Sequence, residues 1–569
     1  MTAIAPDPKH IYRFSLLLFI LVLPIATLRG QNEPSSDWQL SGQLQSRANF
    51  FLRDSLIGAA NIPQYDYQLF GAENWLNLQA GFRGFTLALR FDFFQNSNLL
   101  NPTDSYSGQG VGAWLLEKPM GPLTLSAGYI YDQIGSGLIF RSFEERPLLI
   151  DNALVGVKLK YQVMPDLFIK AFAGRQKRQF DLYGSVVRGF QSEYFFTMNR
   201  RGQSISLAPG AGVVARTLDD GSMNNLVSSL QTYPSAELFV PKYNTYAATL
   251  YQTLRYGPFR WYAEVAFKTK DVYIDPFAQT ILQGDTLTGN RYRQAPGHMF
   301  YSSLSYASGR VGLTIEGKRT SNFGFRTRPQ EALNRGTLNF LPPLTRVNTF
   351  RLTSRYNPAA QELQEWSWQG DLQLSLGEDM TLNLNHSGMQ NDGTTPLYRE
   401  WFLELSRQGG EKHWSLGLQR QIYHQAFYEF KPGAPIVKTI TPFAEVSLDA
   451  GQDRSLRLEM QTLFMNRGED QQLNDYGHWL FALAEYNPSG KWKFAVSDMF
   501  NWKPGRFSPK SGNRSVALHF PRFDIFFQPG THLFSLSYIK QVEGVVCTGG
   551  ICRLEPAFSG VQFTLNSSF

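Results

Sequence analysis

The last stretch of the chain, Ser559-Gly560-Val561-Gln562-Phe563-Thr564-Leu565-Asn566-Ser567-Ser568-Phe569, decides how the remainder is interpreted. Apolar residues stand at most of the odd positions and polar residues at the even positions. Successive side chains of a strand point to opposite faces, so this stretch predicts a strand with one apolar and one polar face.

Two interpretations fit such a terminal strand. It looks like the last strand of a bacterial outer-membrane β-barrel, in which a C-terminal residue such as Phe569 is read by the barrel-assembly machinery. It is equally compatible with an ordinary edge strand of a soluble sheet. The choice between them depends on whether the same pattern recurs along the chain.

The pattern recurs from Trp38 onward as pairs of alternating segments joined by tight turns. Residues 76–82 and 85–93 flank Arg83-Gly84, and residues 246–256 and 259–270 flank Gly257-Pro258. Much longer connections separate these pairs. Short turns at one end and long loops at the other are typical of an outer-membrane barrel. The longest predicted loops are residues 133–152, 178–242, 271–297 and 321–345. Within the second of these, residues 186–196 are either a strand that projects beyond the membrane or another wall strand.

Composition favours the same fold. Charged residues make up 18% of the 569 residues, aromatic residues 14%, and the formal net charge is +7. No apolar stretch beyond the N-terminal leader approaches the ~20 residues of a membrane-spanning helix. We therefore predict an all-β protein, a single transmembrane antiparallel outer-membrane β-barrel of roughly 24 strands (22–26), with short periplasmic turns and long extracellular loops. The count includes a concealed strand within 321–345 that turns at Leu341-Pro342-Pro343.

The first 30 residues predict a secretory signal peptide, because Lys9 and Arg13 precede the apolar run from Phe14 to Ala26. Residues 31–569 would then form the barrel. This organisation predicts location in the outer membrane of a Gram-negative bacterium. The mild net charge and the expected export argue against a nucleic-acid partner.

Charged side chains cluster in the loop at residues 132–151 and on the polar faces of the predicted strands. Because the loop also holds apolar residues and flexible glycines, it could fold into the lumen and pair with basic wall residues. A basic wall would favour anions, although any water-filled barrel needs polar walls. A self-paired surface loop remains the alternative for this stretch. The candidate lumen and constriction residues are Asp132, Arg141, Glu144, Glu145, Arg146, Asp151, Lys158, Lys170, Arg260 and Lys268.

The two cysteines, Cys547 and Cys552, flank Thr548-Gly549-Gly550, a sequence typical of a turn. In an exported protein such a pair is best interpreted as a disulfide that pins a loop tip. A metal site would need four ligands and no histidine lies nearby, so neither a metal nor a cofactor is predicted. A redox role stays open, although the spacing is not that of a C-x-x-C motif.

Two blocks resemble a known family. Residues 135–154, which include Gly135-Ser136-Gly137 and Glu144-Glu145-Arg146, and residues 339–345 are similar to blocks of a Bacteroidota outer-membrane family of unknown function. The resemblance implies an outer-membrane location in a Gram-negative bacterium and brings no established activity.

Two functions of different classes remain open. The first is a porin-like transport channel whose loops constrict the lumen. The second is an interaction protein, the outer-membrane part of a secretion or surface-assembly complex with a periplasmic or secretion-system partner. Besides these, the predicted partners are membrane lipid and the assembly machinery. The histidines are scattered singly and show no catalytic triad, so we do not predict an enzyme.

Overall fold

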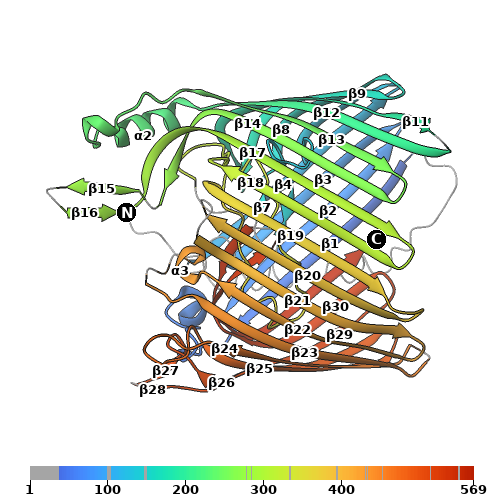
Figure 1. Cartoon of the computed structure of the whole chain (residues 1–569), viewed down its shortest axis with the longest axis vertical. Helices are drawn as coiled ribbons and strands as arrows, with labels where there is room; N and C mark the ends of the chain where they lie inside the picture. Colours follow the sequence, from blue (N-terminus) through green and yellow to red (C-terminus); the bar gives the residue numbers. More distant parts are fainter. Residues whose placement is uncertain are drawn as a thin grey trace, which may run out of the picture.

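The computed structural model describes residues 38–98, 104–146, 150–200, 202–276, 278–282, 285–331, 335–391, 395–429, 431, 433–451, 453–512, 514–548 and 551–569. The predicted signal peptide lies outside these residues. The described chain forms a closed barrel of antiparallel strands (Figure 1). Each wall strand pairs with its neighbours in chain order, and the last strand pairs with the first.

The barrel wall has 24 strands in the described part of the chain, as predicted, because β11 continues β10 and both pair with β12. The strands are β1 (Trp38–Phe51), β2 (Phe70–Phe82), β3 (Phe85–Ser97), β4 (Tyr106–Met120), β5 (Leu123–Ile130), β8 (Leu154–Met164), β9 (Leu167–Arg178), β10 (Asp181–Tyr194), β11 (Phe196–Arg200), β12 (Gln203–Thr217), β13 (Asn244–Tyr256), β14 (Phe259–Asp275), β17 (Arg291–Ser308), β18 (Val311–Ser321), β19 (Gln364–Ser375), β20 (Met380–Asn391), β21 (Thr395–Gly409), β22 (Lys412–Tyr423), β23 (Val437–Asp449), β24 (Ser455–Met465), β25 (Gly477–Ser489), β26 (Trp492–Pro504), β29 (Leu518–Phe527), β30 (His532–Gln541) and β33 (Phe558–Ser568).

Shorter elements lie in the connections. They are η1 (Gln64–Gln68), β6 (Glu144–Glu145), β7 (Ile150–Asp151), α2 (Asp220–Leu230), η3 (Ser235–Glu237), β15 (Gln279–Leu282), β16 (Asp285–Thr288), α3 (Gln425–Tyr428), β27 (Lys510–Ser511), β28 (Arg514–Ser515), β31 (Gly544–Thr548) and β32 (Ile551–Glu555). None of the described helices is long and apolar enough to cross a membrane.

The outer face of the wall is apolar and the inner face is polar, which is the reverse of a soluble protein. On β14, the outward-facing Phe267 is 58% exposed, whereas the inward-facing Glu264 and Lys268 are 1% and 3% exposed. Exposed Leu, Phe, Trp and Val side chains recur around the outer face. So large an exposed apolar surface is unfavourable in water and favourable against lipid. The alternation read from the sequence therefore separates a lipid-type outer face from a polar inner face.

The barrel closes where β1 meets β33. The backbone amide of Phe569 donates to the carbonyl of Gly42 at 3.0 Å, and the amide of Gly42 donates back at 2.8 Å. The ring of Phe569 lies where a side chain at position 42 would stand, so a larger residue at position 42 would displace that ring. The proposed role of Phe569 as an assembly signal stays a prediction.

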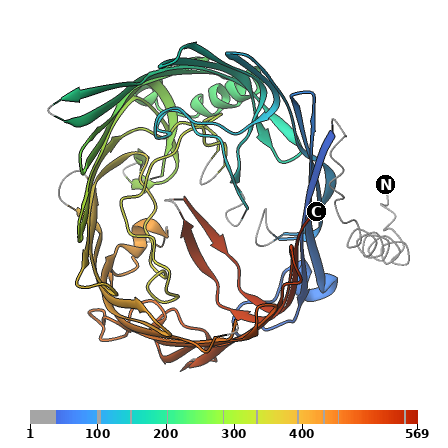
Figure 2. The same cartoon turned by 90° about the vertical axis from the view of Figure 1, so that its right-hand side faces the viewer.

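Two segments fold back into the barrel from the end that carries the long connections. We call the described residues of 131–153 the first luminal segment and the described residues of 322–363 the second luminal segment. Figure 2 looks into the barrel and shows both inside the ring of strands, together with the hairpin β31–β32. The second segment joins β18 to β19, which are adjacent in the wall.

The concealed strand predicted within 321–345 is wrong. Within the second luminal segment the described residues form no wall strand, only an isolated bridge between Arg326 and Thr337. Pro342 and Pro343 cannot donate to a ladder, and Phe323, Phe325 and Leu338 bury their side chains in the lumen.

Wall strands lie instead inside 178–242, which was predicted to be a long connection with residues 186–196 as either a projecting strand or another wall strand. That stretch contains β10, β11 and β12 in the wall, followed by a connection that contains α2. On β12 the inward positions Gly212 and Val214 are small or apolar, because they pack against Ile134 of the first luminal segment. The polar inner face that marks other strands is therefore interrupted at these two positions and resumes at Arg216.

Candidate functional site

The two luminal segments contact one another at the blocks singled out in the sequence. The amide of Arg141 donates to the carbonyl of Leu338 at 2.8 Å, and the amide of Phe340 donates to the carbonyl of Gly137 at 3.0 Å. The side chain of Asn152 donates to the carbonyl of Thr337 at 3.1 Å. The luminal segments thus form one unit inside the barrel.

That unit has an apolar core of its own, which also includes wall residues. The ring of Phe140 packs on Phe172 of β9 with 4.4 Å between centroids. Burying these side chains away from luminal water favours the packed position of both segments. The buried residues of the segments in this core are Ile134, Leu138, Ile139, Phe140, Phe323, Phe325, Leu338 and Leu341.

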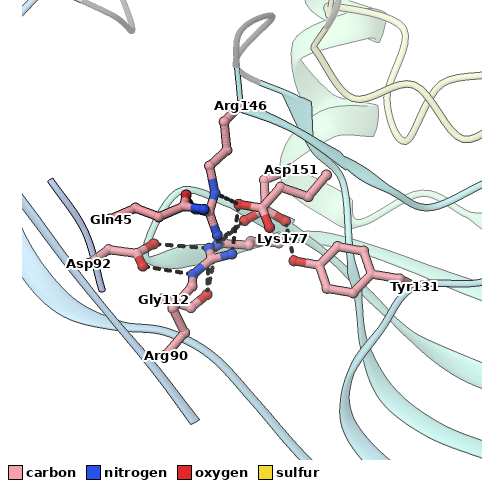
Figure 3. Close-up of polar contacts among 9 residues, drawn as sticks. Gln45, Arg90, Asp92, Gly112, Tyr131, Arg146, Asp151 and Lys177 are labelled. Carbon is pink, nitrogen blue, oxygen red and sulfur yellow. Dashed lines mark hydrogen bonds and ion pairs between the residues drawn. The ribbon is translucent and has the colours of Figure 1, made fainter. Parts of the chain in front are cut away.

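A buried arginine on the wall binds the end of the first luminal segment (Figure 3). Arg90 of β3 contacts both carboxylate oxygens of Asp92, at 2.7 and 2.9 Å. Its Nη1 donates to Glu144 at 2.7 Å, and its Nη2, which also contacts Asp92, donates to Asp151 at 2.8 Å. Its side chain is only 6% exposed. The planar guanidinium therefore joins two carboxylates of the segment to one of the wall.

Asp151 receives further donors. Lys177 of β9 pairs with it, and the hydroxyl of Tyr131 donates to it at 2.8 Å. Burial raises the pKa of this carboxyl, but Lys177 and Arg90 outweigh burial, so the pKa lies below its ordinary value. Asp151 is therefore a carboxylate at neutral pH. Beside it, Arg146 bonds to Glu144 at 2.9 Å and to Gln45 of β1.

The start of the first luminal segment is held by three other wall residues. Asp132 lies 2.7 Å from Lys170 and 3.2 Å from Lys158. Glu264 of β14 accepts from the amide of Ser136 at 2.9 Å and from its hydroxyl at 2.5 Å. A buried wall carboxylate thus takes up the donors of the glycine-rich turn.

The second luminal segment is held on both sides of the barrel. On one side, Lys318 of β18 pairs with Glu365 at 2.7 Å and donates to the carbonyl of Pro342 at 2.8 Å. Arg216 of β12 pairs with Asp271 at 2.8 Å and donates to the carbonyl of Arg326 at 3.0 Å. Paired wall cations thus also bind backbone carbonyls of the segment.

On the opposite side, a carboxylate and a neutral amide of the wall, and a carboxylate in the connection between β24 and β25, accept hydrogen bonds from the segment. Glu400 of β21 accepts from Asn348 at 2.9 Å. Gln461 of β24 accepts from the amide of Leu352 at 2.7 Å. Asp475 accepts from the hydroxyl of Tyr356 at 2.6 Å. The second segment therefore spans the lumen from the first half of the wall to the second half.

Several predicted residues meet in these contacts: Asp132, Glu144, Arg146, Asp151, Lys158, Lys170 and Lys268, the last of which pairs with Asp271 at 3.5 Å. Arg141 instead stacks on the rings of Phe143 and Phe340, at 4.7 and 4.1 Å. Glu145 lies in β6 opposite Ile150 of β7. Arg260 is exposed beside the turn at 257–258 and lies apart from the network.

The sequence did not single out three wall cations that bind carbonyls or carboxylates, Arg90, Lys177 and Arg216, or the wall carboxylate Glu400, which accepts from Asn348. Arg90 and Asp92 share the polar face of one strand, which was the available signal. The basic wall residues Lys158, Lys170, Lys177, Lys268 and Lys318 are paired with carboxylates. Their charge is balanced locally, so the wall alone gives no reason for anion selectivity.

A cavity of about 630 Å³ remains beside the second luminal segment. It lies between residues 343–358 of that segment, the residues after α3, and the base of the hairpin β31–β32. The described residues contain no group of three His, Cys, Asp or Glu arranged to hold a metal ion.

The two cysteines face each other in backbone register, since Cys547 of β31 pairs with Cys552 of β32. We predict a disulfide that closes this hairpin. Intact-mass analysis after alkylation should detect two added groups only when reductant is present, and complete alkylation without reductant would refute the bond. Cys547→Ser with Cys552→Ser should still assemble, because closing so short a loop removes little chain entropy.

Comparison with solved structures finds barrels that are distant in sequence. The translocation pore of the P pilus usher (PapC) is 8% identical, with 93% of this chain and 99% of that chain covered and a TM-score of 0.40. The copper transporter OprC is 9% identical, with 94% and 81% covered and a TM-score of 0.42. OccK5 (OpdH) of Pseudomonas aeruginosa is 12% identical, with 68% and 93% covered and a TM-score of 0.36. Likeness this distant carries no argument about function.

No curated protein matches the chain. The sequence predicted a Bacteroidota outer-membrane family of unknown function. The Bacteroidota origin of this chain stays a prediction. Residues 11–569 match the family of unknown function DUF6029, and the chain belongs to that family.

Proposed function

We propose that this protein is a transport channel of the Gram-negative outer membrane, with a lumen constricted by its two luminal segments. Export would use residues 1–30 as the signal peptide. The proposal rests on the polar inner wall. This wall encloses two segments that are bound to it, and a cavity of about 630 Å³ remains beside them. Wall side chains alone cannot fill a barrel of this strand number.

The constriction is built to stay in place. Its charged groups are paired with the wall, and its apolar side chains form a shared core with β9, β10 and β12. Removing one partner of a buried ion pair is costly, so spontaneous departure of the segments is unfavourable. We therefore infer a narrow permanent path rather than a wide pore that opens and closes.

Planar-bilayer recording of the purified protein tests the proposal. We expect a small and steady conductance, well below that of an unobstructed barrel of this strand number. Barrel folding is checked in the same preparation by heat-modifiable mobility on a gel. A folded protein that gives no conductance at any voltage would refute the channel.

The second candidate is a barrel in a secretion or surface-assembly complex. It is favoured by exposed apolar residues at the end that carries the long connections, where Val240 is 83% exposed and Leu238 is 51% exposed. A folded barrel without conductance that retains a stable partner on purification from native membranes would support it.

A further inference from the structure

The cavity beside the second luminal segment has a distinctive set of cations. Three arginines of that segment, Arg346, Arg351 and Arg355, line it, and Lys431 lies beyond the end of α3. All three arginines come from one stretch of ten residues that is bound to the wall through Asn348 and Leu352. Their positions relative to the cavity are therefore fixed by the fold.

Two of the arginines are held mainly by aromatic rings. The guanidinium of Arg346 lies 3.4 Å from the ring centroid of Phe402, and that of Arg355 lies 4.9 Å from Tyr476 and 4.8 Å from Trp479. Their nearest carboxylate contacts are long, at 3.4 Å to Glu404 and 3.8 Å to Asp475. Stacking on a ring uses the face of a guanidinium and leaves the N–H groups at its edge.

Some N–H donors of these arginines have no acceptor among the described residues. Nη1 of Arg346 and Nε of Arg355 are buried and have no hydrogen-bond partner among the described residues. Arg351 is exposed to the cavity, and in the described part of the chain no carboxylate lies within 4 Å of it. Buried donors without acceptors are unfavourable, so an acceptor that enters the cavity would be bound.

The acidic residues of the cavity are placed differently. Asp475 accepts from Tyr356 and, at 2.8 Å, from Gln425. Glu429 pairs with Lys431 at 2.7 Å. The other two, Glu543 and Glu555, lie at the base of the hairpin β31–β32, and the negative charge of Glu555 is near enough to attract the guanidinium of Arg351. The stretch 346–355 therefore presents a basic side to the cavity.

We propose that the cavity binds a small organic anion through its carboxylate or phosphate groups, with Arg351 as the main contact. Arginine suits these groups because its N–H fork matches the spacing of two oxygens. Arg346 and Arg355 supply further positive charge. This proposal rests on the proposed channel and names the class of solute that would pass through it.

Titration calorimetry of the detergent-purified protein tests the site, with citrate and inorganic phosphate in separate arms and sucrose as the neutral probe. We expect binding of citrate or phosphate and none of sucrose. Arg351→Gln should weaken that binding about tenfold, the scale of one hydrogen bond to a charged group. The fold should be unaffected, because Arg351 makes no ion pair that holds the segment.

Arg260→Gln is the matched control. It removes the same charge from an inward-facing position on β14, outside the cavity lining, and should leave the affinity unchanged. No binding of either anion to the parent, or equal weakening by Arg260→Gln and Arg351→Gln, would overturn the proposal. Bilayer recordings separate the proposed anion site from the proposed channel. Conductance without anion binding would contradict the site and support the channel. Anion binding without conductance would support the site and contradict the channel.

Discussion

Replacing residues 322–363 by a four-residue Gly-Ser linker should raise single-channel conductance severalfold while the barrel still assembles. The register makes this possible, because Ser321 at the end of β18 lies directly opposite Gln364 at the start of β19. A short turn can therefore join the two strands without shifting their pairing. The wall cations that lose carbonyl contacts, such as Lys318, would face water in the widened lumen.

The measurement is planar-bilayer recording with heat-modifiable mobility as the check on folding. The matched control replaces residues 276–290 by the same linker. There, Asp275 of β14 lies opposite Arg291 of β17, and the hairpin β15–β16 extends away from the barrel (Figure 1). The control should conduct like the parent. Equal conductance of the parent and the 322–363 variant would show that the second luminal segment is no constriction.

Arg90→Met should release the first luminal segment. The substitution leaves Asp92 without its partner and removes one cation from Glu144 and Asp151. Breaking a buried ion pair by removing one member costs about 3–5 kcal/mol. Amides of the segment, such as that of Ser142, which donates to Asp132, should then exchange hydrogen roughly a hundredfold faster or more.

Hydrogen exchange followed by mass spectrometry measures this effect peptide by peptide. Arg457→Met is the control, because Arg457 of β24 pairs with Glu445 and Glu459 and makes no ion pair with the first luminal segment. Asp151→Asn combined with Arg90→Met should cost less than the sum of the single changes. Unchanged exchange in Arg90→Met would mean that the apolar core and the other wall contacts, such as Lys170 to Asp132, hold the segment without Arg90.

The barrel was predictable from the sequence because lipid and lumen impose opposite polarity on alternate side chains. The alternation at β14 and β33 reports that difference directly. It fails at β12, where Gly212 faces Ile134 rather than water. The same pattern wrongly predicted a strand that turns at Leu341-Pro342-Pro343, because apolar residues buried in the lumen resemble the residues of a strand.

The site was only partly predictable for a related reason. Opposite charges suggested that Asp132 would meet Lys158 and Lys170, and the structure places them together. Local sequence could not show that Arg90 reaches Asp151, because that contact joins β3 to a segment 61 residues away. The cavity arginines were missed because Arg346, Arg351 and Arg355 lie outside any alternating pattern.

The way in which the second luminal segment spans the lumen has a consequence for how the barrel comes to be closed. Its two ends leave from β18 and β19, in the middle of the strand order, and its contacts reach Arg216 on one half and Gln461 on the other. In an open sheet the edges β1 and β33 are separated by nearly the whole chain, so bringing them together costs much chain entropy. A segment bound to both halves curves the sheet from within and shortens that search. Residues 322–363 would thus act as an internal template, and their removal should slow assembly even where the finished barrel is stable.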